Sequence, residues 1–343
     1  MCLGGKPWFS LIVCVLGLGS ALVAASLGLA QPASPEPAAP APSPAPAIEG
    51  APAPMPTAAP TVAQLPSGPP ARSTVRLVSA GAEPRAELRY AAAIGTREAV
   101  MVTTRSSTDL EMGFGVQVTR LPATRVIVEM GPVGDAGAGR LMVAFHFTAL
   151  EVVPTEGVSP DVVARLQREF SPIVGLQGYQ LIDRQGLGTA VDIVIPPGTP
   201  TALAEQIQAL RRNLHDLFAP FPAEPVGLGA VWEVRTQVET NHILAEQVTT
   251  YTLTARAGEE ISLGVTLTQT APGQDLPAPQ PGVRARLDSL QATGTGSMDL
   301  KLSHLTPTTH LLTRALVHST VATGGFAQRV RMGMDLDVSF GLP

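Results

Sequence analysis

Beyond residue 74, most of the chain alternates apolar and polar residues with a period of two. In the segment WEVRTQVE, at 232–239, Trp232, Val234 and Val238 face one way while charged and amide side chains face the other. The same alternation places apolar residues on one face of five further segments: Phe114, Val116 and Val118; Val126, Val128 and Met130; Leu141, Val143, Phe145 and Phe147; Ile261, Leu263, Val265 and Leu267; and Phe326, Val330, Met332, Met334, Leu336, Val338 and Phe340. A period of two with one apolar face predicts antiparallel strands joined by short turns.

Two segments follow a helical period instead. In SPDVVARLQREF, Ser159 is a capping residue, Pro160 occupies the first helical position, and an apolar stripe ends at Phe170. The second segment runs from Thr199 to Phe218, and its stripe consists of Leu203, Ile207, Leu210, Leu214 and Leu217. An open apolar sheet face needs a cover, so these stripes are expected to provide it.

The predicted fold is therefore a β-rich α+β domain over residues 73–343, with a central helical insertion at 159–170 and 199–218. The last alternating run, from Phe326 to Phe340, is long for a strand. Long strands twist, so the antiparallel sheet is expected to curl into a half-barrel or open barrel, with both amphipathic helices on its apolar face.

A glycine-containing stretch, EPVGLGAVWEV at 224–234, raises the question of a phosphate-binding loop. Such a loop lies between a strand and the start of a helix, whereas here a strand follows Gly227 and Gly229. The glycines are therefore expected to turn the chain into a strand whose first inward residue is Trp232. Together with the preceding FAPFPA, this stretch resembles a bacterial exported or envelope domain family of unknown function. TTYTLTARAGEEISLGVTL and GTGSMDLKLSHLTP, farther along the chain, fit it as well.

In outline the pattern also has a distant likeness to lipoprotein-carrier-type half-barrels, in which a curled sheet and helices enclose an apolar ligand. The resemblance implies an envelope location and a shape, but no activity. Cys14 departs from the lipid-attachment cysteine expected of such proteins, because it lies between Val13 and Val15.

The N-terminus predicts export. Lys6 precedes an apolar run from Trp8 to Ala30, which is typical of a signal peptide at 1–30 and is also long enough to serve as an uncleaved signal anchor. Residues 31–72 follow, with fourteen prolines among 42 residues. Such a composition cannot fill a core and predicts a disordered linker. The expected location is the bacterial periplasm or cell envelope, with membrane contact only through the N-terminal segment if it stays uncleaved.

The candidate chemistry is sparse. A net charge of −5 does not favour nucleic acid as a partner, and both cysteines, Cys2 and Cys14, lie in the N-terminal segment. The histidines lack metal-ligand spacing, and neither a nucleophile elbow nor a zinc-protease motif is present. Asp335 and Asp337 share one strand face with Arg329 and Arg331, which favours a solvated charged surface over a calcium or acid–base site.

The sequence accordingly predicts a non-catalytic envelope protein, without cofactor or metal, whose β-rich domain is an interaction module for another envelope protein. Two alternatives are a carrier that binds a lipid or other apolar molecule in the curled sheet, and an exported hydrolase without a recognised motif. The candidate face for an apolar ligand, which is equally a candidate core, consists of Trp232, Leu203, Ile207, Leu210, Leu214, Leu217, Met332 and Met334.

Overall fold

The computed structural model describes residues 73–112, 115–195, 207, 218–240, 242–277 and 282–343. The predicted N-terminal segment and linker lie outside these residues, and so does the second predicted helix apart from Ile207 and Phe218. The elements are, in chain order, β1 (Thr74–Ser79), β2 (Glu98–Met112), β3 (Gly115–Arg120), β4 (Ala123–Gly137), β5 (Arg140–Val153), α2 (Pro160–Phe170), η2 (Ser171–Ile173), β6 (Gln177–Ile182), β7 (Gly188–Val194), β8 (Val231–Thr240), β9 (Ile243–Ala257), β10 (Glu260–Ala271), β11 (Gln274–Leu276), β12 (Val283–Lys301), β13 (Thr308–Thr323) and β14 (Phe326–Gly341).

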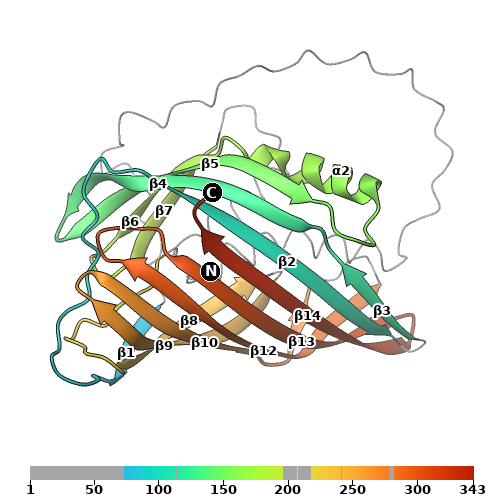
Figure 1. The fold of residues 1–343 in the computed structure, drawn as a ribbon. Helices are drawn as coiled ribbons and strands as arrows, with labels where there is room; N and C mark the ends of the chain where they lie inside the picture. Colours follow the sequence, from blue (N-terminus) through green and yellow to red (C-terminus); the bar gives the residue numbers. More distant parts are fainter. Residues whose placement is uncertain (1–72, 113–114, 196–206, 208–217, 241, 278–281) are drawn as a thin grey trace, which may run out of the picture.

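The described strands form one antiparallel sheet, as the alternation predicts. Its order is β1-β8-β9-β10-β12-β13-β14-β2-β4-β5-β6-β7, with β11 on β12 and β3 on β2 as side branches. The two ends of this path are β1, which pairs with β8, and β7, which pairs with β6. The sheet is therefore not closed. Figure 1 shows β12, β13, β14 and β2 crossing the front obliquely, while β4 and β5 run along the top.

The inner face of the curl carries the main core. Apolar side chains from β2, from β4 to β10 and from β12 to β14 pack into one cluster. Four of the five further segments behave as predicted over most of their length. In β10, for example, Ile261, Leu263, Val265 and Leu267 are all buried.

Two predictions about inward positions are wrong. Val116 and Val118 are 61% and 65% exposed, because β3 pairs only with β2 in the described sheet and extends beyond the curl. Phe326 is 86% exposed, because it begins β14 at the tip of the hairpin that follows β13. Alternation identifies a strand but does not reveal where the sheet stops covering it.

The first predicted helix is present as α2. The Ser159 hydroxyl accepts a hydrogen bond from the Val162 amide at 3.4 Å, and Pro160 begins the helix. Leu166 and Phe170 pack against Val152 of β5. Among the described residues, α2 is the single α-helix longer than one residue. The described residues form no helix that is long and apolar enough to cross a membrane.

Gln167 of α2 satisfies part of the β5 backbone. Its side chain accepts from the Val152 amide at 2.8 Å and donates to the Leu150 carbonyl at 3.0 Å. β6 pairs with β5 only from Leu141 to His146, so this later stretch has no strand neighbour on that side among the described residues. The glutamine therefore takes over the hydrogen bonds that a strand would have made.

Two loop segments, 80–92 and 218–230, together form what we call the cap. They pair with each other through Ala86 and Val226. The cap also reaches separate parts of the sheet: Tyr90 donates its amide to the Arg184 carbonyl at 2.8 Å, and Gly229 donates to the Leu253 carbonyl at 2.8 Å. The turn between β6 and β7 is thereby joined to β9 across the opening of the sheet.

Candidate functional site

The inner face is the surface that the sequence singled out, and Trp232 lies in a fully buried part of it. Trp232 is fully buried near the start of β8, as predicted, and its indole Nε1 donates to the Pro220 carbonyl at 2.9 Å. Its ring stacks on Tyr251, with centroids 5.6 Å apart, and meets Phe221 edge-on at 6.4 Å. Tyr90 continues the cluster by stacking on Phe221 at 5.0 Å. An aromatic plug therefore fills this end of the sheet.

The glycines of the 224–234 stretch serve the cap. A Cβ on Gly227 would lie 1.7 Å from the Ala82 carbonyl oxygen, so only glycine permits this approach of two backbones. Gly229 has φ +80° with open space around it, so its requirement is conformational. Both glycines turn the chain into β8, in agreement with the sequence prediction.

The other predicted residues of the apolar face separate into groups. Ile207 is buried in the main core, and Met334 packs against it partly buried. Met332 instead belongs to a second, smaller cluster with Ala245, Leu287 and Val317. Leu203, Leu210, Leu214 and Leu217 lie outside the described residues. The predicted face is thus divided between two clusters.

Small and polar residues occupy the inner face between these clusters. In one cross-strand row, Thr249 of β9 faces Leu267, then Gly294, Thr313 and Leu336 follow on successive strands. The hydroxyls of Thr309 and Thr313 are buried and make no hydrogen bond with any part of the chain that the structure describes. An unpaired buried hydroxyl costs about 1–3 kcal/mol, so this row is less well satisfied than the plug.

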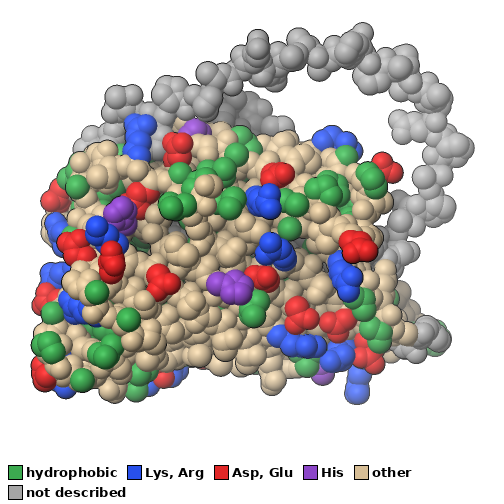
Figure 2. Space-filling model, in the orientation of Figure 1, with side chains coloured by type: hydrophobic (Ala, Val, Ile, Leu, Met, Phe, Trp, Pro, Cys, Tyr) green, Lys and Arg blue, Asp and Glu red, His purple; other side chains and the backbone are tan. Residues whose placement is uncertain are grey.

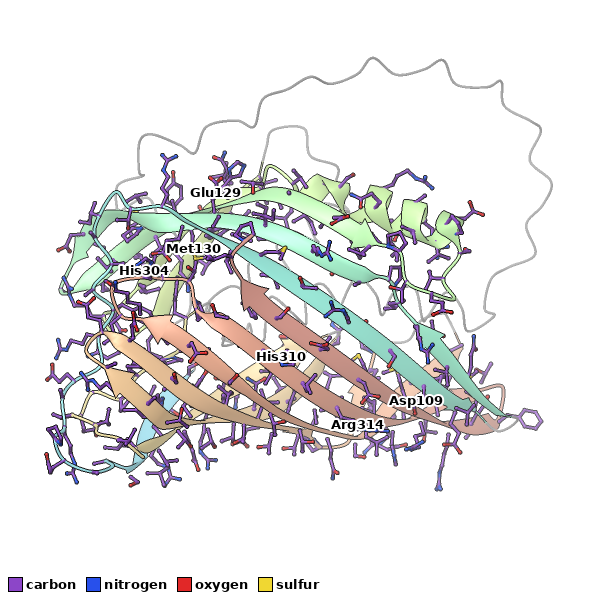
Figure 3. The ribbon with its side chains drawn as sticks, viewed as in Figure 1. Asp109, Glu129, Met130, His304, His310 and Arg314 are labelled. Carbon is purple, nitrogen blue, oxygen red and sulfur yellow. The ribbon has the colours of Figure 1, made fainter. Side chains whose placement is uncertain are left out.

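The outer face carries a cleft of about 820 Å³ that the sequence did not predict. It crosses β12, β13, β14 and β2, and its far wall is formed by the β3–β4 turn and by the loop after β5. Figure 3 shows Arg314 and His310 on this face of the sheet, and Figure 2 shows charges of both signs spread over it. The lining residues are Thr103, Arg105, Ser106, Ser107, Arg120, Leu121, Ala123, Arg125, Val153, Pro154, Thr155, Glu156, Thr293, Gly294, Thr295, Leu312, Thr313, Arg314, Asp335, Leu336 and Asp337. Gly294, Thr313 and Leu336 belong to the inner row and also border this cleft.

Four arginines line the cleft, against three carboxylates, a difference of 4 − 3 = +1. Asp337 accepts a hydrogen bond from His310 at 3.0 Å, whereas its nearest contact with Arg105 is 3.6 Å. The contact of Arg314 with Asp335 is 3.8 Å. Both arginine contacts exceed hydrogen-bond length, so these guanidinium groups keep donors available for another molecule.

Arg120 is still less engaged. In the part of the chain that the structure describes, its guanidinium makes no hydrogen bond or ion pair. Arg120 faces Ser107 across the β2–β3 pair, and Arg105 lies two positions before Ser107 on the same face. Diagonal neighbours of this kind are about 7–8 Å apart, so both guanidinium groups can reach one ligand.

A second hollow, of about 520 Å³, lies along the same face near His318 and Arg329. Its Arg331 donates to Glu111 at 3.1 Å, whereas its Arg329 makes no hydrogen bond or ion pair within the described chain. The larger cleft differs from this hollow in its volume and in the number of arginines that line it.

Asp335 and Asp337 share one face, as the sequence predicts, but they are part of the cleft wall and not only of a solvated surface. No group of three or more potential metal ligands gathers among the described residues. Sequence analysis missed Arg105, Arg120 and Arg125 as site residues. The sequence does place one arginine at an outward position of each of three consecutive strands, β2, β3 and β4. That these arginines line one cleft follows only from the pairing of β14 with β2.

Comparison with known proteins adds little. No protein-family model matches the chain, and no curated protein matches it in sequence. Among solved structures, the translocator domain of the autotransporter NalP from Neisseria meningitidis aligns with 71% of this chain and 88% of its own, at 10% identity and a TM-score of 0.12. A likeness of this strength assigns neither fold nor function. The resemblance to an envelope domain family stays a prediction.

Proposed function

We propose that the protein is an exported, non-catalytic binding protein of the bacterial cell envelope, whose β-rich domain recognises a partner through its outer cleft. The N-terminal apolar segment and proline-rich linker support export. The observation that carries the binding role is the 820 Å³ cleft, in which arginine side chains from several strands lack hydrogen-bonded partners within the described chain. Ligand sites are concave and present a few convergent polar groups, and the cleft meets both criteria.

Site-specific photocrosslinking in the host bacterium tests this proposal. Leu312 lines the cleft and is 50% exposed, so a photoreactive residue at this position is expected to form a discrete adduct with a partner. Leu228, in the cap, is 56% exposed and serves as the matched control. A discrete adduct at Leu312 alone supports the proposal. Absence of an adduct at Leu312, or equal labelling at both positions, contradicts it.

A second candidate function is the binding of an apolar or amphipathic molecule on the inner face. Thr309 favours it: this residue faces Met298 and Phe340 of the main core, does not line the outer cleft, and has a buried hydroxyl without a partner among the described residues. A Thr309→Val variant distinguishes the two candidates. If a ligand uses the hydroxyl, this variant binds an apolar fluorescent probe more weakly than wild type. If Thr309 only packs, the variant is at least as stable as wild type and no saturable probe binding is seen in either protein.

A further inference from the structure

The charged residues that line the outer cleft limit the kind of ligand that it can bind. This inference rests on the proposed function. A ligand with many negative charges is disfavoured, because Glu156, Asp335 and Asp337 also line the cleft. A ligand without any negative charge would leave the free donors of Arg105 and Arg120 unused. The lining therefore suits a molecule with a single, well-placed anionic group.

Apolar side chains also line the cleft in the region around these two arginines. Leu121 follows Arg120 directly and is half-buried, while Val153 and Pro154 line the wall after β5. Leu312 is opposite Asp337 on β13 and leaves half of its surface exposed. An apolar group of the ligand can pack on these side chains, next to the guanidinium groups of Arg105 and Arg120.

We infer that the cleft binds a carboxylate joined to an apolar group, with Arg105 and Arg120 holding the carboxylate and Leu121, Val153 and Leu312 contacting the apolar part. Arginine suits this role because its planar guanidinium donates two parallel hydrogen bonds to one carboxylate. Ser107, between the two arginines, adds a hydroxyl donor. A peptide that ends in an apolar residue carries this chemistry, and so does a fatty acid.

Isothermal titration with defined ligands tests the inference. The probes are an N-acetylated tetrapeptide ending in leucine with a free carboxylate, the same peptide as its C-terminal amide, and octanoate. The free peptide or octanoate is expected to bind, more weakly as salt rises, and amidation is expected to weaken peptide binding by about tenfold or more, as for the loss of hydrogen bonds between charged groups. Tighter binding of the peptide identifies a chain end as the natural ligand, and tighter binding of octanoate identifies a fatty acid.

Matched variants test whether the ligand binds in the cleft. The double variant Arg105→Gln, Arg120→Gln is expected to weaken binding of the free carboxylate by about tenfold or more. Arg284→Gln removes an exposed arginine of β12 outside the cleft lining and is expected to bind like wild type. Thermal unfolding checks that all variants remain folded, which is expected because Arg105 is 58% exposed.

The outcomes separate this inference from the proposed function. Equal binding of the acid and the amide, or binding that the double variant leaves intact, overturns the carboxylate assignment. So does a lack of binding by all three probes. If photocrosslinking at Leu312 nevertheless yields its discrete adduct, the cleft remains a binding surface for a ligand of other chemistry.

Discussion

The two faces of β13 and β14 are made by alternate residues of the same strands, yet they differ in the burial and charge of their side chains. Inward, Leu311, Val338 and Phe340 pack into the main core. Outward, Arg314 is 67% exposed, and its nearest carboxylate is 3.8 Å away. The inner face holds the fold together around its aromatic plug, whereas the outer face leaves charged groups with unused hydrogen-bonding capacity. Substitutions on the two faces should therefore separate stability from binding.

The largest expected effect is on the plug. Trp232→Ala removes a fully buried side chain and its hydrogen bond to Pro220, and is expected to lower the free energy of unfolding by about 3–5 kcal/mol. Chemical denaturation measures the loss. Leu228→Ala, at an exposed position of the cap, is the control and should stay within about 0.5 kcal/mol of wild type. Equal losses in both variants would contradict the assignment of Trp232 to the core.

The cap glycines come next. Gly227→Ala forces the new Cβ against the Ala82 carbonyl and is expected to cost about 1–3 kcal/mol, since the backbone has to shift. Gly229→Ala meets open space and adds only the strain of a positive φ, about 1–2 kcal/mol. Thermal unfolding should thus rank the two variants. If Gly229→Ala proved clearly worse than Gly227→Ala, the close approach of the two cap segments would be wrong.

The plug should also be sensitive to alkali. Burial raises the pKa of the Tyr90 phenol above its ordinary value of 10.0. The protonated form is favoured in the folded state, so the stability contribution is complete below pH 10 and falls as pH rises further. Denaturation midpoints between pH 8 and about pH 11 should show this decline, and Tyr90→Phe should reduce it. An identical decline in the variant would assign the alkaline loss to other groups.

The smallest effects are expected on the outer face. Arg314→Gln should change the free energy of unfolding by less than about 0.5 kcal/mol, because the ion pair is long and solvated.

Near β1, the hydrogen bond from Arg76 lowers the pKa of Glu233 below its usual 4.5. Its contribution is present above that pH and is lost as pH falls through the depressed value. Glu233→Gln should flatten this part of the acid-unfolding curve. A large loss at neutral pH in either variant would show that the outer face is structural.

The sequence predicted the inner face well and the site poorly, for a physical reason. A period of two identifies inward residues wherever the sheet covers them, as in β10, because the alternation is a local property of a strand. It failed at Val116, Val118 and Phe326, where the sheet ends and both faces meet water. The cleft depends instead on pairing between distant strands: Arg105 and Asp337 are 337 − 105 = 232 positions apart and meet only because β14 pairs with β2. No local pattern carries that information.

The most direct test of the account is a map of where a ligand binds. Amide chemical shifts of the protein, recorded while the free-carboxylate peptide is titrated, report perturbation residue by residue. The account predicts the largest changes at Arg105 and Ser107 of β2, at the turn containing Arg120 and Leu121, and near Leu312, with residues of the plug such as Trp232 unchanged. Changes centred on the plug and on inner-face residues outside the cleft lining, such as Thr309, would contradict it and would place the binding function inside the sheet.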